Sequence, residues 1–245
     1  MRKHNYIIGT GYHARHDNGD ALSWFYRIWE ANTFKYADPF AVYVIATGDG
    51  RIPDQIRPEV YWVPILGDLG YIGDLLHGAK PYALSGYTVA LFTLALLAYQ
   101  NECDLVFKEQ DALAFGPYID TMYSEIGTHG CIFGKSGSWA CAQSVMLILH
   151  SFLPEFVRLH LGTGPENVVA NIGEEKMKRL EQQNPGSFCR FTFGVDRERP
   201  FDVKSPVWYG QKFTGAEMLD LRNAGLIEFN GDPPGGSSFT NCPNP

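Results

Sequence analysis

The chain has 245 residues and a formal net charge of -7 at neutral pH. Because an acidic surface is repelled by a phosphate backbone, this charge argues against nucleic acid as a partner. The 45% hydrophobic and 14% aromatic content is typical of a folded, enzyme-sized domain and excludes a disordered chain.

The cysteines and the apolar runs indicate where in the cell the protein is expected. The five cysteines are odd in number and include no Cys-x-x-Cys pair, which favours a reducing compartment and disfavours a zinc site. The longest apolar run, 89–99, is shorter than the about 20 residues that cross a bilayer. With no signal-peptide core after Met1, we expect a soluble, cytoplasmic protein without a transmembrane segment.

The first half of the chain alternates buried strand-like runs with helical patterns. Apolar spacing predicts strands at 6–11, 40–46, 60–65 and from 104, and helices at 20–32 and 85–101. This order predicts an α/β fold, with a mostly parallel sheet covered by helices on both faces.

The second half is less regular. Its patterns predict a strand at 130–134, either one helix or a strand followed by a helix within 142–161, and helices at 173–183 and 214–224. Thr214 and Glu217 have the spacing of a capping box. The Gly- and Pro-rich residues 231–245 predict a surface tail. We expect one domain over residues 1–230, with halves at 1–115 and 116–230, followed by this tail.

The strand that begins at Asp104 ends on two carboxylates one residue apart, Glu109 and Asp111. In an extended chain, residues i and i+2 point to the same face, so both side chains are expected to reach one point. A divalent cation with oxygen ligands offsets the repulsion between two such carboxylates and their lost hydration. The alternative is a solvated strand terminus, because acidic residues commonly end strands.

Polar and glycine-rich segments also follow the other predicted strands. Thr10, Gly11 and Tyr12 follow the first strand, and Asp49 and Arg51 follow the second. The carboxyl ends of parallel strands share one edge of a sheet, where ligands bind, so these segments predict a common site. Asp49 also has an ordinary explanation, because Thr-Gly-Asp-Gly is a typical turn sequence.

The buried helix at 85–101, followed by a strand that ends in Glu109-Gln110-Asp111, resembles the GT-A fold glycosyltransferases, which carry an Asp-x-Asp motif at this place. The likeness covers roughly the first half of the chain, and here Glu stands at the first acidic position. It implies a GT-A-like, Rossmann-like fold with an irregular, acceptor-side C-terminal half. It also implies an enzyme that moves a sugar from a nucleotide-diphosphate donor to a hydroxyl of a glycan or other acceptor.

The resemblance implies a metal-assisted reaction at the acidic motif. Mn²⁺ or Mg²⁺ stabilises the diphosphate leaving group in such enzymes. Asp111 is then the direct metal ligand, and Glu109 binds the metal through water or contacts the donor ribose or sugar. Arg51 or Lys80 pairs with phosphate, although Lys80 also suits an ordinary solvated surface.

The resemblance also assigns the donor base and the acceptor. Thr10, Gly11 and Tyr12 lie where similar enzymes hold the base and ribose, and Asp49 is placed to accept a hydrogen bond from a uracil or guanine ring nitrogen.

An acidic pair, Glu174 and Glu175, opens the predicted helix at 173. Its placement is similar to that of the acidic pair on the acceptor side of many GT-A enzymes. For an inverting transfer, this implies Glu175, or else Glu174, as the general base for the acceptor hydroxyl. The alternative is that the pair only complements the helix dipole.

Two other functions stay open. A sugar-phosphate nucleotidyltransferase is less favoured, because the loop from Gly9 to Arg15 offers Arg15 as its only permanent cation for a triphosphate. A noncatalytic nucleotide- or carbohydrate-binding protein would retain the same fold.

Overall fold

The computed structural model describes residues 3–14, 19–48, 57–65, 86–134, 142–162, 173–193, 203–231 and 233. The strands in these ranges are β1 (Tyr6–Ala14), β2 (Ala41–Gly48), β3 (Val60–Pro64), β4 (Asp104–Lys108), β5 (Ala112–Phe115), β6 (Cys131–Gly134), β7 (Ala142–Ile148), β8 (Phe188–Arg190) and β9 (Trp208–Gln211). The helices are α1 (Gly19–Tyr36), α3 (Gly86–Gln100), α4 (Tyr118–Glu125), the 3-10 helix η1 (His150–Phe152), α5 (Leu153–Gly162), α6 (Gly173–Gln183) and α7 (Gly215–Asn223). None of the helices within these ranges is long and apolar enough to cross a membrane.

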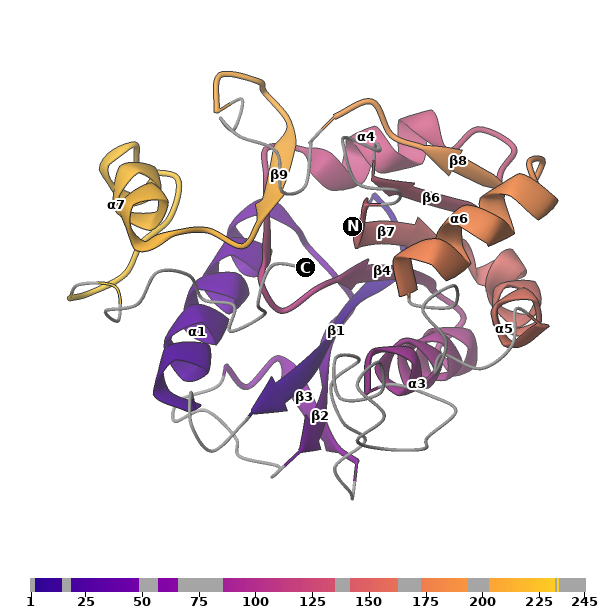
Figure 1. The fold of residues 1–245 in the computed structure, drawn as a ribbon, viewed down its shortest axis with the longest axis horizontal. Coiled ribbons are helices and arrows are strands. Elements are labelled where there is room, and N and C mark those ends of the chain that lie inside the picture. The colour runs from indigo at the N-terminus through magenta and orange to yellow at the C-terminus, as the bar shows by residue number, and fades with distance from the viewer. Residues whose placement is uncertain are drawn as a thin grey trace.

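Seven strands form one sheet in the order β3-β2-β1-β4-β7-β6-β8 (Figure 1). The first four of these strands are parallel, β7 runs antiparallel to both β4 and β6, and β6 and β8 are parallel. The predicted α/β fold with a mostly parallel sheet is therefore confirmed. The carboxyl ends of β1, β2, β3 and β4 share one edge of this sheet, as the sequence predicted.

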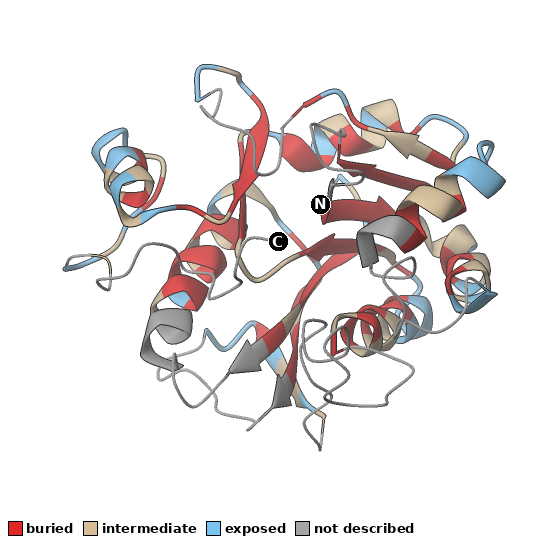
Figure 2. Ribbon diagram, viewed as in Figure 1, coloured by how far each residue is buried: buried red, intermediate tan, exposed pale blue. Residues whose placement is uncertain are grey.

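Each face of the sheet carries its own apolar core, so the central strands are buried on both sides (Figure 2). Neighbouring residues alternate between the two cores: Ile8 and Val106 pack with α1 and α4, whereas Ile7 and Leu105 pack with α3, α5 and α6. This alternation follows from the two-residue repeat of a strand. Strands buried on both faces explain why their sequences are continuous apolar runs.

Helix α3 packs unusually close to β1, and glycines make this possible. A Cβ atom at Gly9 would lie 2.2 Å from a Leu94 methyl group, and one at Gly11 would lie 3.0 Å from the Ala90 Cβ. Gly9 and Gly11 are two residues apart and face the same helix. The close packing of α3 therefore explains why glycines occupy these two positions.

The predicted end of the first strand at Gly11 is wrong. β1 continues to Ala14, because its pairing with β2 runs as far as the pair Ala14 and Gly48. Its pairing with β4 stops at Gly9, much earlier in the strand. Among the described strands, β2 alone pairs with the outer part of β1, and a glycine in the middle of the strand does not end it.

The second half contains the predicted elements and some that the sequence did not reveal. β6, β7, α5, α6 and α7 correspond to the predictions, and the capping box is present: Thr214 Oγ1 accepts from Glu217 N (3.3 Å) and Thr214 N donates to Glu217 Oε2 (2.7 Å). The unpredicted elements are α4, β5, β8 and β9. Of the predicted tail at 231–245, the structure describes residues 231 and 233 alone.

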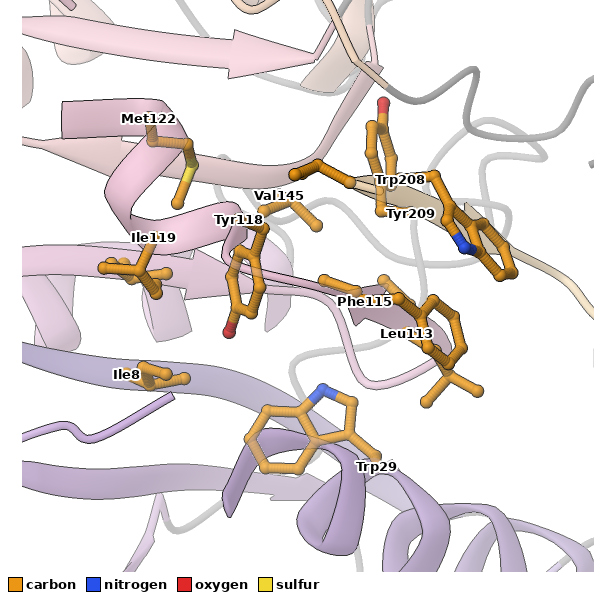
Figure 3. Close-up of a cluster of buried hydrophobic side chains, with 14 of the residues drawn as sticks. Ile8, Trp29, Leu113, Phe115, Tyr118, Ile119, Met122, Val145, Trp208 and Tyr209 are labelled. Carbon is orange, nitrogen blue, oxygen red and sulfur yellow. The ribbon is translucent and has the colours of Figure 1, made fainter. Parts of the chain in front are cut away.

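A second, two-stranded sheet joins distant parts of the chain. β5 pairs antiparallel with β9, and aromatic side chains pack beside this pair (Figure 3). The rings of Phe115 and Trp208 stack with their centroids 4.1 Å apart. Figure 3 shows Trp29 of α1 in the same cluster. Burial of these rings fixes β9 against the first half of the molecule.

Candidate active site

The motif Glu109-Gln110-Asp111 forms the tight turn between β4 and β5. Ala112 N donates to Glu109 O across the turn (3.0 Å), and Glu109 N donates to Ser144 O of β7 (2.8 Å). The predicted geometry, in which an extended strand presents both carboxylates on one face, is therefore wrong, because β4 ends at Lys108. The turn brings the two carboxylates together in another way.

Both carboxylates meet at the side-chain amide of Gln211. Gln211 Nε2 donates to Asp111 Oδ1 (2.7 Å) and also to Glu109 Oε2. Glu109 and Asp111 are half-buried, whereas Gln211 is buried. The expectation that the two acids reach one point is confirmed, and that point lies beyond the carboxyl end of β4.

Ser144 of β7 holds the other end of the same amide. Its hydroxyl donates to Gln211 Oε1 (3.2 Å), and its main-chain carbonyl accepts from Glu109 N. One buried serine therefore fixes the backbone at the start of the turn and the amide that faces the carboxylates.

Gln211 is a site residue that the sequence reasoning missed. It lies in β9, where it pairs with Ala112, and it is 100 residues from Asp111 in the sequence. The run Trp-Tyr-Gly-Gln has the aromatic content of a strand. That signal can indicate a strand at 208–211, but it does not indicate which strand it pairs with.

A buried lysine and a buried asparagine connect the two strands that flank the turn. Lys108 Nζ donates to Asn32 Oδ1 (3.0 Å) and lies 4.7 Å from the centroid of the Trp29 ring. Asn32 also bonds Ala114 of β5 in both directions, accepting from its N (3.1 Å) and donating to its O (3.0 Å). Through Asn32, helix α1 ties the strand before the turn to the strand after it.

Burial also changes the acid–base character of Lys108. Removal from water disfavours the ammonium form, which lowers the pKa of Lys108 well below its usual value. The hydrogen bond to the Asn32 oxygen suits either protonation state, because a neutral amine also donates. Lys108 therefore contributes less positive charge to the turn than an exposed lysine would.

The residues predicted to hold the donor base lie inside β1 and not after it. Thr10 is fully buried, and its hydroxyl donates to Gly11 O (3.2 Å). Tyr12 is also buried, with its ring edge-on to those of Tyr26 and Trp62. This corrects their placement, since the strand is longer than predicted. Their contact with a donor stays a prediction.

Several predicted site residues fall outside the described residues. Asp49, Arg51 and Lys80 do so entirely, and their roles stay predictions. Glu174 and Glu175 lie in the first turn of α6, where the sequence predicted a helix, but their side chains are outside the described part.

The described aromatic residues from β8 to β9 are mostly core residues. Phe188, Phe191, Trp208 and Tyr209 are buried within the two apolar clusters. Phe193 is 8% exposed and stacks on Phe191 with a centroid separation of 4.3 Å. The described aromatic residues of this set therefore stabilise the fold.

The chemistry of the acidic turn fits a hard divalent cation. Two carboxylates face one partly positive amide nitrogen, and Mg²⁺ and Mn²⁺ prefer oxygen ligands of this kind. Within the described ranges, no third His, Cys, Asp or Glu forms a cluster with them.

Comparison with known proteins identifies the fold. No protein-family model and no curated protein matches the sequence. An active-site mutant of LgtC matches the structure with a TM-score of 0.51 at 12% identity, covering 92% of this chain and 97% of that chain. Galactosyltransferase LgtC with donor and acceptor sugar analogues gives 0.47 at 12% identity, covering 84% and 86%. Mouse xyloside xylosyltransferase 1 gives 0.45 at 9% identity, covering 80% and 88%. The first of these likenesses shows that the chain has the GT-A fold of glycosyltransferases.

Proposed function

We propose that this chain is a glycosyltransferase that moves a sugar from a nucleotide-diphosphate donor to a hydroxyl acceptor. The observation that carries the proposal is the convergence of Glu109 and Asp111 on one amide, at the sheet edge where parallel α/β folds bind ligands. The GT-A fold supports it, because the solved structures with this fold named above are glycosyltransferases.

The acidic turn is proposed to hold the metal. A bound Mn²⁺ or Mg²⁺ supplies Lewis-acid stabilisation to the departing diphosphate. Asp111 contacts the metal directly, and Glu109 contacts it through water or binds the donor ribose or sugar. Lys108 and Asn32 keep β4 and β5 in place, so that both carboxylates stay at one point.

The remaining proposed roles follow the predictions from the sequence. Thr10, Gly11, Tyr12 and Asp49 bind the base and ribose, and Arg51 or Lys80 binds phosphate. In an inverting transfer, Glu175 or Glu174 takes the proton from the acceptor hydroxyl. The proposed catalytic domain spans residues 1–230, and a cytoplasmic location is part of the same proposal.

The test is release of nucleoside diphosphate from a panel of nucleotide sugars in the presence of Mn²⁺ or Mg²⁺. Wild-type protein should release it, and Asp111→Asn should not. The matched control is Asp120→Asn, since Asp120 is an exposed acid of α4 that pairs with Lys3 (3.0 Å). Full activity of Asp111→Asn would overturn the site assignment.

The same assay separates the alternatives. Pyrophosphate formed from a nucleoside triphosphate and a sugar phosphate would identify a nucleotidyltransferase instead. Binding of a nucleoside diphosphate without turnover of any nucleotide sugar would identify a noncatalytic binding protein.

A further inference from the structure

The amide of Gln211 is held at both of its ends. Its Nε2 donates to the two carboxylates of the turn, and its Oε1 accepts from the Ser144 hydroxyl. Gln211 is 2% exposed and Ser144 is also 2% exposed, so neither contact is exposed to bulk solvent. The amide thus lies between an anionic side and a neutral hydroxyl side.

A cation between the carboxylates would make the position of the amide NH₂ group unfavourable. The NH₂ group of an amide carries partial positive charge and only donates hydrogen bonds, whereas its oxygen only accepts them. A cation beside Asp111 therefore repels the NH₂ group that faces it. The amide oxygen, by contrast, is a ligand that hard cations accept.

Ser144 makes both amide orientations possible. The last torsion of a glutamine side chain has a broad, roughly two-fold profile, so a half-turn exchanges oxygen and nitrogen at little cost in space. A hydroxyl group both donates and accepts hydrogen bonds. Ser144 Oγ can therefore donate to Oε1 in one orientation and accept from Nε2 in the other.

We propose that Gln211 is a ligand of the cation: its Oε1 binds the metal after a half-turn of the amide, while Ser144 accepts from the displaced Nε2. The inference rests on the proposed function, because it takes a cation site at Glu109 and Asp111 as its premise. In the orientation that the structure shows, the same amide holds the two carboxylates together as a donor. Gln211 thereby preserves the shape of the site and completes its ligand set.

The backbone supports this role. Gln211 pairs with Ala112, which directly follows Asp111, so β9 fixes the amide beside the turn. No movement of the main chain is needed, since only the end of one side chain turns.

The first experiment measures the affinity of the protein for Mn²⁺, by electron paramagnetic resonance or calorimetry, in the presence of a nucleoside diphosphate. Gln211→Met should weaken Mn²⁺ binding by about tenfold or more, because the cation loses one of its oxygen ligands. The control Gln100→Met changes an exposed glutamine at the end of α3 and should bind like wild type.

Whether Gln211→Met binds Mn²⁺ more weakly or more tightly than wild type shows whether Gln211 is a metal ligand or only a hydrogen-bond donor to the carboxylates. If Gln211 only donates to the carboxylates, its removal leaves them free for the metal. Gln211→Met would then bind Mn²⁺ as tightly as wild type, or more tightly, and that result would overturn the inference. Gln211→Glu should bind Mn²⁺ about tenfold more tightly than wild type, because added ligand charge raises affinity. Weaker binding by this variant would also count against a ligand role.

A second measurement needs no folded Gln211 variant. In ¹⁵N-labelled wild-type protein, the Gln211 Nε2 protons should move upfield when Mg²⁺ and a nucleoside diphosphate bind, because they leave anionic acceptors for a neutral hydroxyl. The amide protons of exposed Gln100 should not move. Gln211 protons that stay in place, or move downfield, would overturn the half-turn.

The outcomes also distinguish this inference from the proposed function. Wild-type binding of Mn²⁺ that is lost in Asp111→Asn but kept in Gln211→Met overturns the role of Gln211 and leaves the cation site standing. Failure of wild type to bind Mn²⁺ overturns the cation site, and the inference fails with it.

Discussion

The two ends of β4 carry acidic residues in very different surroundings. At the start of the strand, the Asp104 carboxylate accepts from the Tyr123 hydroxyl at Oδ2 (2.6 Å) and from His150 N at Oδ1 (2.6 Å). At the far end, Glu109 and Asp111 accept from the same amide nitrogen. A single carboxylate with a separate donor for each oxygen connects elements, whereas two carboxylates crowded at one point suit a cation.

The comparison teaches that an acid at a strand end is not informative by position alone. Asp104 joins β4 to helix α4 and to the start of η1, at the edge of the sheet opposite to the proposed site. Burial, together with the hydrogen bond to Asp104 and the charge of its carboxylate, raises the pKa of Tyr123 well above the usual value. The crowded pair lies beyond the carboxyl end of β4, at the edge where parallel α/β folds bind ligands.

The largest expected effect is on turnover in Asp111→Asn. Loss of one carboxylate removes a direct metal ligand, so the rate of sugar transfer should fall by at least about 100-fold, as when a group that stabilises charge in a transition state is lost. Steady-state assays with the best donor from the panel measure this. The unfolding midpoint should stay near that of wild type. If activity is lost only because the variant unfolds, Asp111 has a structural role like that of Asp104.

Asp104→Asn is the matching change at the other end of β4. It leaves one acceptor oxygen for two donors, so the free energy of unfolding should fall by about 2 kcal/mol. Urea denaturation measures the loss. The specific activity of the folded variant should equal that of wild type, and a large loss of turnover would show that the two ends are not as different as described.

Lys108→Met tests the buried support between the two ends. In wild type, the folded-state pKa of Lys108 is lowered by burial, so between that pKa and about 10.4 the unfolded chain binds a proton that the folded chain does not. Stability contributed by Lys108 therefore rises with pH in this window and falls as pH is lowered. Wild type should gain up to about 1.4 kcal/mol per pH unit relative to the variant.

Urea unfolding at several pH values from 7 to 10 measures this slope. Parallel pH profiles for wild type and Lys108→Met would show that Lys108 has the same pKa in both states. The methionine side chain keeps much of the length of lysine, so packing near Trp29 changes little.

The smallest effect is expected at the capping box that follows β9. Thr214→Ala removes the side-chain acceptor for Glu217 N, which should lower the free energy of unfolding by about 1 kcal/mol. Thermal unfolding measures this loss. Because Gln211 is held by β5, sugar transfer should be unchanged, and a large loss of activity would place α7 in the site.

The sequence predicted the parallel sheet well, because burial on both faces leaves a direct signal. The continuous apolar runs at 6–8 and 105–107 and the apolar helix at 86–100 are local patterns that need no knowledge of distant contacts. Gly11 was interpreted as the end of a strand, and this was misleading. A glycine is needed there because helix α3 packs closely against β1 at this position.

The candidate site was predicted less completely. Glu109 and Asp111 were found from the motif, but their geometry depends on a turn and not on an extended strand. Gln211 and Asn32 were not found, because their roles depend on contacts across 100 and 82 residues of sequence. Contacts of this kind leave no periodic pattern in the chain.

The most direct test is a crystal structure after soaking with Mn²⁺ and uridine or guanosine diphosphate, with anomalous scattering used to locate the metal. The account predicts one manganese peak in contact with the Asp111 carboxylate and with the diphosphate, beside Glu109. Manganese and diphosphate bound together at another place, or diphosphate bound at this edge with the metal away from Asp111, would contradict it.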